Sequence, residues 1–379
     1  MAAATTDTVT VNPSLLSTFD PAKIAPVGLT TNPNDPNAGN NPYGLVIAPA
    51  TAGLITAGDL IVCNFNNKAN GAQGTGTDIV GLHPNMASAT QTPYTIANNA
   101  ALLGCNALTM LPDDTISAAA FFGSNMTGQN PLVSATGAVS DPFGTAGDTF
   151  HSPWGEAYAQ ANGSNPAALY ISNYDGTIDR IALNGDAQSS FVEIAKGFCG
   201  SGSPGGVYAP AGLTYDPAID TLYIVDSSSN SVVEFLKVSS IGQDGVVVSG
   251  QCTTGTPPVA ATPPTPMPTF TGPSMASAQV IANGGAFNAP ISAALLPDGN
   301  LLVANGDLNN TANLPVAMQN LVMEVSPYLP GGFVGTPIQL DSSGTAAALF
   351  GLVVGMDSQM NPVVYFNDDN ANSVMVLTK

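Results

Sequence analysis

The side chains with the clearest capacity for chemistry are Asn and Asp residues that recur at one position of a repeated sequence pattern. Each lies at or near the end of a short apolar run, as Asp226 does in "TLYIVD". Carboxylate and carboxamide oxygens are the ligands that calcium takes in proteins, so a ring of them could hold this ion. The alternative is that each side chain bonds the backbone of its own turn. The candidates are Asn64, Asn173, Asp226, Asn305 and Asn367.

A second candidate is the segment "HSPWGE", in which His151 and Glu156 could form an acid–base pair beside Trp154. An exposed loop histidine beside a packed tryptophan is the alternative. The other histidine, His83, lies in the turn "GLHPN". The sequence has no G-x-S-x-G, H-E-x-x-H, P-loop or dinucleotide-binding motif, so no motif assigns a catalytic residue. Three aromatic residues could stack a sugar or an apolar ligand, or could pack in the core; they are Tyr43, Trp154 and Phe350.

Four cysteines, Cys63, Cys105, Cys199 and Cys252, occur without the C-x-x-C spacing of zinc or redox sites. An even number in a chain with few lysines fits disulfide bonds and an extracytoplasmic location. We expect the pairs Cys63–Cys105 and Cys199–Cys252, although four cysteines allow three pairings. Four buried free thiols in a cytosolic protein are the alternative.

The composition limits the classes of partner. Of 379 residues, 44% are hydrophobic and 8% are charged, and six Lys and Arg against 26 Asp and Glu give a net charge of −20. This charge repels phosphate groups, so nucleic acids and acidic membranes are not expected partners. No apolar run reaches the roughly 18 residues of a membrane span. The first residues, "MAAATTDTVTV", lack the basic and apolar segments of a signal peptide, so we expect none in this sequence.

A repeat organises most of the chain. Units such as "APAGLTYDPAIDTLYIVDSSSNSVVEF" contain short Val-, Ile- and Tyr-rich strands between Gly, Pro, Asn and Asp turns. Several strands per unit and a period of about 50 residues predict an all-β fold, a six-bladed β-propeller. The units begin near residues 42, 105, 153, 210, 290 and 349.

The segments "PDGNLLVANGD" and "DTLYIVDSSSNSVVEF" resemble NHL-type propeller repeats, and the resemblance spans roughly residues 42–379. The resemblance implies a fold rather than a reaction. It also implies that all inner strands begin on the same face of the propeller, which we call the upper face. We expect any ligand to bind on this face. Calcium-dependent lactonase propellers carry Glu and Asn ligands on their inner strands. The corresponding positions in this sequence are Tyr43, Asn106, Trp154, Ala211, Ile291 and Phe350. Of these side chains, only Asn106 could act as a calcium ligand.

The last repeat lacks a fourth strand, which the N-terminus could supply. We expect residues 1–41 to form an arm and linker in which "SLLSTF", residues 14–19, closes the last blade of its own chain or of a neighbour. Residues 42–379 would form the propeller, with a Thr/Pro-rich insertion at 238–278.

Because each recognisable catalytic set is incomplete, we expect an extracellular, non-enzymatic structural or interaction module that could assemble into filaments through its N-terminal strand. Its partners would be further copies, another extracellular protein or a glycan. We expect no cofactor other than a calcium ion. The alternative is a calcium-dependent, lactonase-like hydrolase, or a propeller that binds a small ligand or carbohydrate at its channel mouth.

Overall fold

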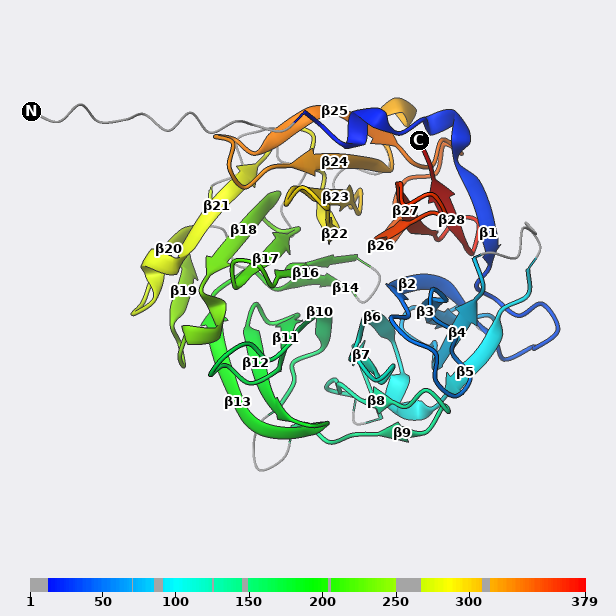
Figure 1. Cartoon of the computed structure of the whole chain (residues 1–379), viewed down its shortest axis with the longest axis horizontal. Helices are drawn as coiled ribbons and strands as arrows, with labels where there is room; N and C mark the ends of the chain where they lie inside the picture. The colour runs from blue at the N-terminus through cyan, green and yellow to red at the C-terminus, as the bar shows by residue number, and fades with distance from the viewer. Residues whose placement is uncertain are drawn as a thin grey trace, which may run out of the picture.

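The chain folds as an all-β, six-bladed β-propeller, as the repeat predicts. The computed structural model describes residues 13–69, 71–84, 91–124, 126–144, 149–203, 206–249, 267–308 and 314–379. Six sheets surround a central axis, and one edge strand of each lies beside that axis (Figure 1). These inner strands are β2 (Gly39–Ile47), β6 (Cys105–Met110), β10 (Pro153–Ala159), β16 (Pro210–Asp216), β22 (Pro290–Leu295) and β26 (Leu349–Met356).

The other strands of each blade follow outward from the axis in antiparallel order. The second strands are β3 (Leu60–Asn67), β7 (Ile116–Ala120), β11 (Ala168–Asn173), β17 (Thr221–Asp226), β23 (Leu301–Asn305) and β27 (Pro362–Asp368). The third are β4 (Asp78–Leu82), β8 (Leu132–Val133), β12 (Ile178–Asn184), β18 (Ser231–Leu236), β24 (Leu321–Val325) and β28 (Ser373–Leu377). The fourth are β5 (Tyr94–Asn98), β9 (Val139–Ser140), β13 (Ala187–Lys196), β21 (Ala278–Asn283), β25 (Phe333–Gln339) and β1 (Ala25–Leu29).

The strands are apolar on both faces because every blade is covered by two neighbours. In β17, Leu222 and Ile224 pack toward the third blade, whereas Tyr223 and Val225 pack toward the fifth. Successive side chains of a strand point to opposite faces, so a strand buried on both sides reads as a continuous apolar run. This packing fixes each inner strand relative to the axis.

The last blade is closed by an N-terminal strand, but the predicted segment was wrong. Strand β1, from the predicted linker, pairs with β28 of the same chain along the outer edge (Figure 1). Residues 14–19 instead contain the 3₁₀ turn η1 (Leu16–Thr18). Glu324 of β24 explains the difference, because its Oε2 accepts hydrogen bonds from Ser14 Oγ and the Leu16 N–H, both at 2.7 Å. The Ser17 N–H also donates to Ser14 Oγ at 3.1 Å, so the segment is held as a turn rather than as a strand.

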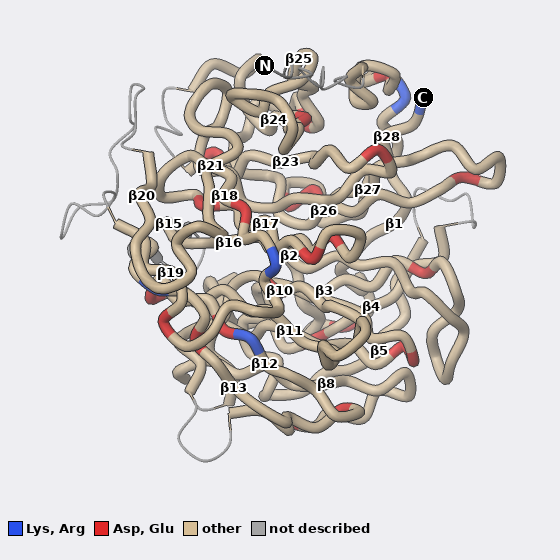
Figure 2. Tube along the Cα trace, turned by 60° about the vertical axis from the view of Figure 1, so that its left-hand side comes forward, with Lys and Arg blue, Asp and Glu red and all other residues tan. Residues whose placement is uncertain are grey.

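The predicted insertion is partly built into the fold. Its ends form β19 (Val246–Ser249) and β20 (Thr269–Thr271), and β19 adds in parallel to β13 of the third blade. A separate hairpin, β14 (Ser201–Ser203) with β15 (Gly206–Tyr208), precedes the fourth blade. Acidic residues are spread over the described chain and basic residues are few (Figure 2). The described residues contain no helix of the length and apolarity that a membrane crossing requires.

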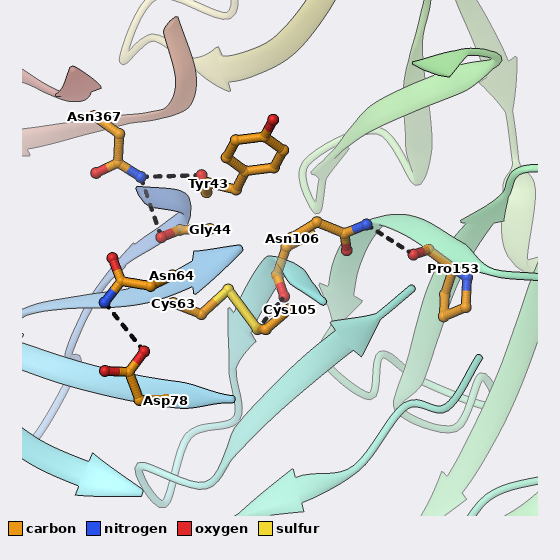
Figure 3. Close-up of a disulfide and its surroundings, with 10 residues drawn as sticks. Tyr43, Gly44, Cys63, Asn64, Asp78, Cys105, Asn106, Pro153 and Asn367 are labelled. Carbon is orange, nitrogen blue, oxygen red and sulfur yellow. Dashed lines mark hydrogen bonds between the residues drawn. A yellow bond between two sulfur atoms is a disulfide. The ribbon is translucent and has the colours of Figure 1, made fainter. Parts of the chain in front are cut away.

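A disulfide joins the first two blades. Cys63 of β3 is bonded to Cys105 of β6, as predicted, and both side chains are fully buried (Figure 3). Cys199 is also buried, whereas Cys252, its predicted partner, lies outside the described residues.

Removing this bond is expected to destabilise the propeller strongly. The cysteines are 42 residues apart, and closing a loop of this length lowers the free energy of the folded state relative to the unfolded chain by about 4 kcal/mol in the chain-entropy model. The double variant Cys63→Ala/Cys105→Ala should lose about this much in urea unfolding. Wild-type protein unfolded under reducing conditions is the control, and an unchanged unfolding free energy in the variant would contradict the expectation.

Candidate functional site

Each inner strand has a β-bulge close to its start, and the bulges determine what lies on the axis. In the third blade Pro153 pairs with Asn173 and Gly155 pairs with Ser172, which leaves Trp154 without a partner residue. A bulge adds a residue to one strand and redirects its side chain. The bulge residues are the six positions named above for the lactonase comparison, Tyr43, Asn106, Trp154, Ala211, Ile291 and Phe350.

Most of the bulge residues form an apolar plug across the upper end of the channel. Tyr43 stacks on Phe350 with ring centroids 3.6 Å apart and on Phe65 at 4.4 Å, and Trp154 meets Tyr43 edge-on at 6.0 Å. Phe121 and Ile291 complete the cluster. The three predicted ligand-binding aromatics are therefore buried against one another, and the upper face is closed on the axis.

The predicted metal ligands occupy equivalent positions in four blades. Asn64, Asn173, Asp226 and Asn305 each pair with the proline that directly precedes the bulge in the neighbouring inner strand. In the last blade the residue at this place is Asp368, one position after the predicted Asn367. The bulge after Leu349 has the same register as the bulge after Pro210, so Asp368 is the counterpart of Asp226.

These side chains position the backbone. Asn173 Oδ1 accepts from the His151 N–H at 3.3 Å, and Asn305 Oδ1 accepts from the Asn288 N–H at 2.9 Å, in both cases two residues before the proline. Asn367 Nδ2 donates to the carbonyl of Tyr43 at 3.0 Å and so ties the last blade to the first (Figure 3).

The other two ring members also bond close neighbours. Asn64 Nδ2 donates to Asp78 Oδ1 at 3.2 Å (Figure 3), and Asp226 accepts from the hydroxyls of Ser228 at 2.6 Å and Ser229 at 2.5 Å. Within the described residues no three His, Cys, Asp or Glu side chains group as metal ligands. Calcium binding at the ring stays a prediction.

A cavity of about 90 Å³ lies directly below the plug. It continues into a larger space of about 300 Å³ that is open to solvent near the lower ends of the inner strands. Both spaces border Leu45, Leu108, Glu156, Leu213, Ala293 and Leu352, so they are successive parts of one channel. The route to the cavity is therefore from the lower face, whereas the predicted binding face is the upper one, and binding at the upper face stays a prediction.

Three polar side chains border this cavity with an atom that has no hydrogen-bond partner. The atoms are Asn106 Oδ1, Glu156 Oε2 and Ser292 Oγ. Asn106 is 7% and Glu156 is 6% exposed. A buried polar atom without a partner is costly, so these atoms mark a place where a ligand or water would be bound.

Of the two carboxyl oxygens of Glu156, Oε1 accepts hydrogen bonds and Oε2 has no hydrogen-bond partner. Its Oε1 accepts from the Ser117 hydroxyl and from Asn130 Nδ2, the latter at 3.0 Å. Asn130 Nδ2 also contacts Ser117 Oγ at 2.8 Å, which fixes all three side chains together. Burial raises the pKa of Glu156 to about 7, and the hydrogen bonds from Ser117 and Asn130 limit the rise.

The two histidines lie elsewhere. His151 is 54% exposed with its Nδ1 3.6 Å from Asp175 Oδ2, so it does not form the predicted pair with Glu156. His83 Nδ1 lies 2.5 Å from Asp59 Oδ1 in the first blade, and Tyr94 donates to Asp59 Oδ2 at 2.6 Å. Sequence reasoning named Glu156 and Asn106 singly but missed Ser117, Asn130 and Ser292, because no local pattern marks a serine or asparagine as a neighbour of a residue in another blade.

Solved structures of similar fold include enzymes. A gluconolactonase from Xanthomonas campestris is 12% identical, with 92% of this chain and 88% of that chain covered and a TM-score of 0.54. A luciferin-regenerating enzyme is 9% identical over 92% of this chain and 94% of that chain, with a TM-score of 0.51. A Bacteroides thetaiotaomicron protein of unknown function is 9% identical over 94% and 75%, with a TM-score of 0.54. No protein-family model and no curated protein matches the sequence.

At these identities the likeness shows the fold, a six-bladed propeller. The prediction of a non-enzymatic structural module that forms filaments is contradicted, because the solved structures of this fold include a gluconolactonase and a luciferin-regenerating enzyme. That prediction depended on the absence of a known catalytic motif. A propeller can build its site from residues that are far apart in the sequence, so a missing motif was weak evidence.

Proposed function

We propose that the protein is an enzyme that hydrolyses a small uncharged ester or lactone in the channel cavity, with Glu156 as general base. The observation that supports this most is the Glu156 carboxyl group, which borders the cavity with one oxygen fixed and the other unpartnered. A pKa of about 7 suits a group that takes up and returns a proton near neutral pH. Lactones are the first substrates to test because a solved propeller of this fold is a gluconolactonase.

In the proposed reaction the Glu156 carboxylate removes a proton from water as the water oxygen bonds to the carbonyl carbon. The bond from that carbon to the leaving oxygen then breaks, and Glu156 returns the proton to the leaving oxygen. The products are a carboxylic acid and an alcohol, joined in one molecule when the substrate is a lactone. Inner strands are sheet edges, so backbone N–H groups left unpaired there could stabilise charge on the carbonyl oxygen.

The test is Glu156→Gln, assayed with a panel of lactones and aryl acetates. Removing a general base is expected to lower kcat about 10²- to 10⁴-fold. For the wild type, kcat/KM should rise tenfold per pH unit below about 7 and level off above it. The matched control is Glu234→Gln, since Glu234 of β18 is also a buried carboxyl with a raised pKa but does not border the cavity. Absent turnover in the wild type, or equal turnover in both variants, would refute the proposal.

A calcium-dependent hydrolase remains the second form of this proposal, supported by the ring of Asn and Asp side chains near the plug. It requires that chelation with EDTA abolishes turnover and that added calcium restores it. We further propose an extracytoplasmic location, which the Cys63–Cys105 disulfide supports.

A further inference from the structure

Asn106 is the exception among the six bulge residues. The other five, from Tyr43 to Phe350, are apolar or aromatic and pack in the plug. Asn106 is 7% exposed and lies in the wall of the cavity below. An amide at a position that is otherwise apolar adds polar atoms to the deepest part of the channel.

The orientation of this amide is fixed. Asn106 Nδ2 donates to the carbonyl of Pro153 at 3.1 Å, and Pro153 begins the inner strand that carries Glu156 (Figure 3). With its nitrogen bonded to the backbone, the amide presents its oxygen on the other side, and Oδ1 has no partner. The cavity is therefore bordered by a buried hydrogen-bond acceptor, Asn106 Oδ1, as well as by the unpartnered oxygen of Glu156.

The remaining lining excludes one class of ligand. Among the described residues that border the cavity or the space below it, none is Lys, Arg or His. Glu156 is the charged residue of this wall, and the whole chain carries a net charge of −20. An anionic ligand would meet a carboxyl group and no cation, whereas an uncharged hydrogen-bond donor would satisfy Asn106 Oδ1.

We propose that Asn106 selects substrates that carry a hydroxyl group beside the reacting carbonyl, so that the enzyme acts on uncharged hydroxylated lactones or esters. This rests on the proposed function, because it assigns the substrate class of the same cavity. The hydroxyl donates to Asn106 Oδ1 while the carbonyl lies within reach of the water that Glu156 activates. A site built to bond a substrate hydroxyl rejects an analogue without it, because the buried acceptor is then left unpaired.

The test compares α-hydroxy-γ-butyrolactone with γ-butyrolactone. In the wild type, kcat/KM is expected to be about 100-fold higher for the hydroxylated lactone. Asn106→Leu keeps the size of the side chain and removes the acceptor, and it should reduce this ratio to near one by lowering kcat/KM for the hydroxylated lactone. Turnover of both lactones at equal rates in the wild type would overturn the proposal and leave the proposed function standing.

A binding measurement tests the selection by Asn106 independently of the proposed hydrolysis. In the Glu156→Gln background, titration calorimetry should detect α-hydroxy-γ-butyrolactone, and adding Asn106→Leu should weaken it about tenfold or more. Absence of lactone turnover in the wild type, with Asn106-dependent binding intact, would sink the proposed reaction and retain the selection by Asn106. Binding that is equal with and without the Asn106 amide, or no binding of the hydroxylated lactone to the Glu156→Gln protein, would overturn the selection.

Discussion

Removing residues 1–30 is expected to open the last blade and to cost most of the stability of the protein. The deletion removes β1 and exposes the paired edge of β28, whose Val374 and Met375 lie opposite Gly28 and Pro26. It also removes three buried apolar side chains, Leu16, Phe19 and Val27. Burial of such side chains contributes roughly 1.5–3 kcal/mol each, or about 5–9 kcal/mol together. A typical unfolding free energy is about 5–15 kcal/mol, so little would remain.

Removing residues 1–20 is the matched control because it leaves β1 in place. This shorter deletion loses Leu16 and Phe19 and the bonds to Glu324, and it should cost roughly 3–6 kcal/mol in urea unfolding. Hydrogen exchange should stay slow at the β28 amides in this variant and become fast when residues 1–30 are absent. A peptide of residues 13–30 should restore slow exchange. Equal stability and equal exchange in the two deletions would mean that β1 does not close the blade.

The positions of the blades could be predicted because every blade of a propeller repeats the same pattern of strands and turns. Five inner strands begin at the predicted residues, 105, 153, 210, 290 and 349. The remaining inner strand, β2 of the first blade, begins at Gly39 rather than at residue 42, because Gly39 and Asn40 continue the pairing with β3. Each turn and each apolar strand is determined by a few consecutive residues, so their order along the chain can be recognised in the sequence.

The closing strand could not be chosen from the sequence because the choice depends on a distant residue. "SLLSTF" and "APVGL" are both short apolar segments, and either could add to an edge. Glu324, more than 300 positions away, bonds Ser14 and Leu16 and holds the first segment in a turn. The second segment then reaches β28.

The candidate site was predictable in position but not in function. The six positions compared with the lactonases all lie at bulges, and four of the five ring residues occupy equivalent positions, whereas Asp368 lies where Asn367 was expected. Their roles differ because burial decides them: Tyr43, Trp154 and Phe350 pack together, and Asn173 and Asn305 bond backbone N–H groups. The environment of Glu156 comes from Ser117 and Asn130 in another blade, which no spacing in the sequence indicates.

Lowering the pH from 8 to 5 is expected to stabilise the protein, the reverse of ordinary acid denaturation. Burial raises the pKa of Asp78 and of Asp307 to about 6 and the pKa of Glu156 to about 7. Burial, helped by the charge of Asp368, raises the pKa of Asp369 to about 7. The folded protein therefore binds protons more tightly than the unfolded chain, in which these carboxyl groups ionise near pH 4.

The sign follows from proton binding. Between about pH 4 and pH 7 unfolding releases protons, so the contribution of these groups is complete below pH 4 and is lost as the pH rises through 6 and 7. Each group contributes a slope of about 1.4 kcal/mol per pH unit within its range, and we expect a total difference on the order of 8 kcal/mol between pH 5 and pH 8. Urea unfolding at pH 5, 6, 7 and 8 measures it, and stability that rises with pH would contradict it.

Glu156→Gln connects this titration to the proposed chemistry. The variant should lose about 1.4 kcal/mol per pH unit from the slope of the unfolding free energy between pH 5 and pH 7, because one titrating group is gone. The pKa that governs kcat/KM belongs to the free enzyme, as does the pKa that governs its stability. The difference in unfolding free energy between the wild type and Glu156→Gln stops changing with pH above the pKa of Glu156. This pH must therefore equal the pH at which kcat/KM levels off. Two different values would mean that another group is the base, even if Glu156→Gln is inactive.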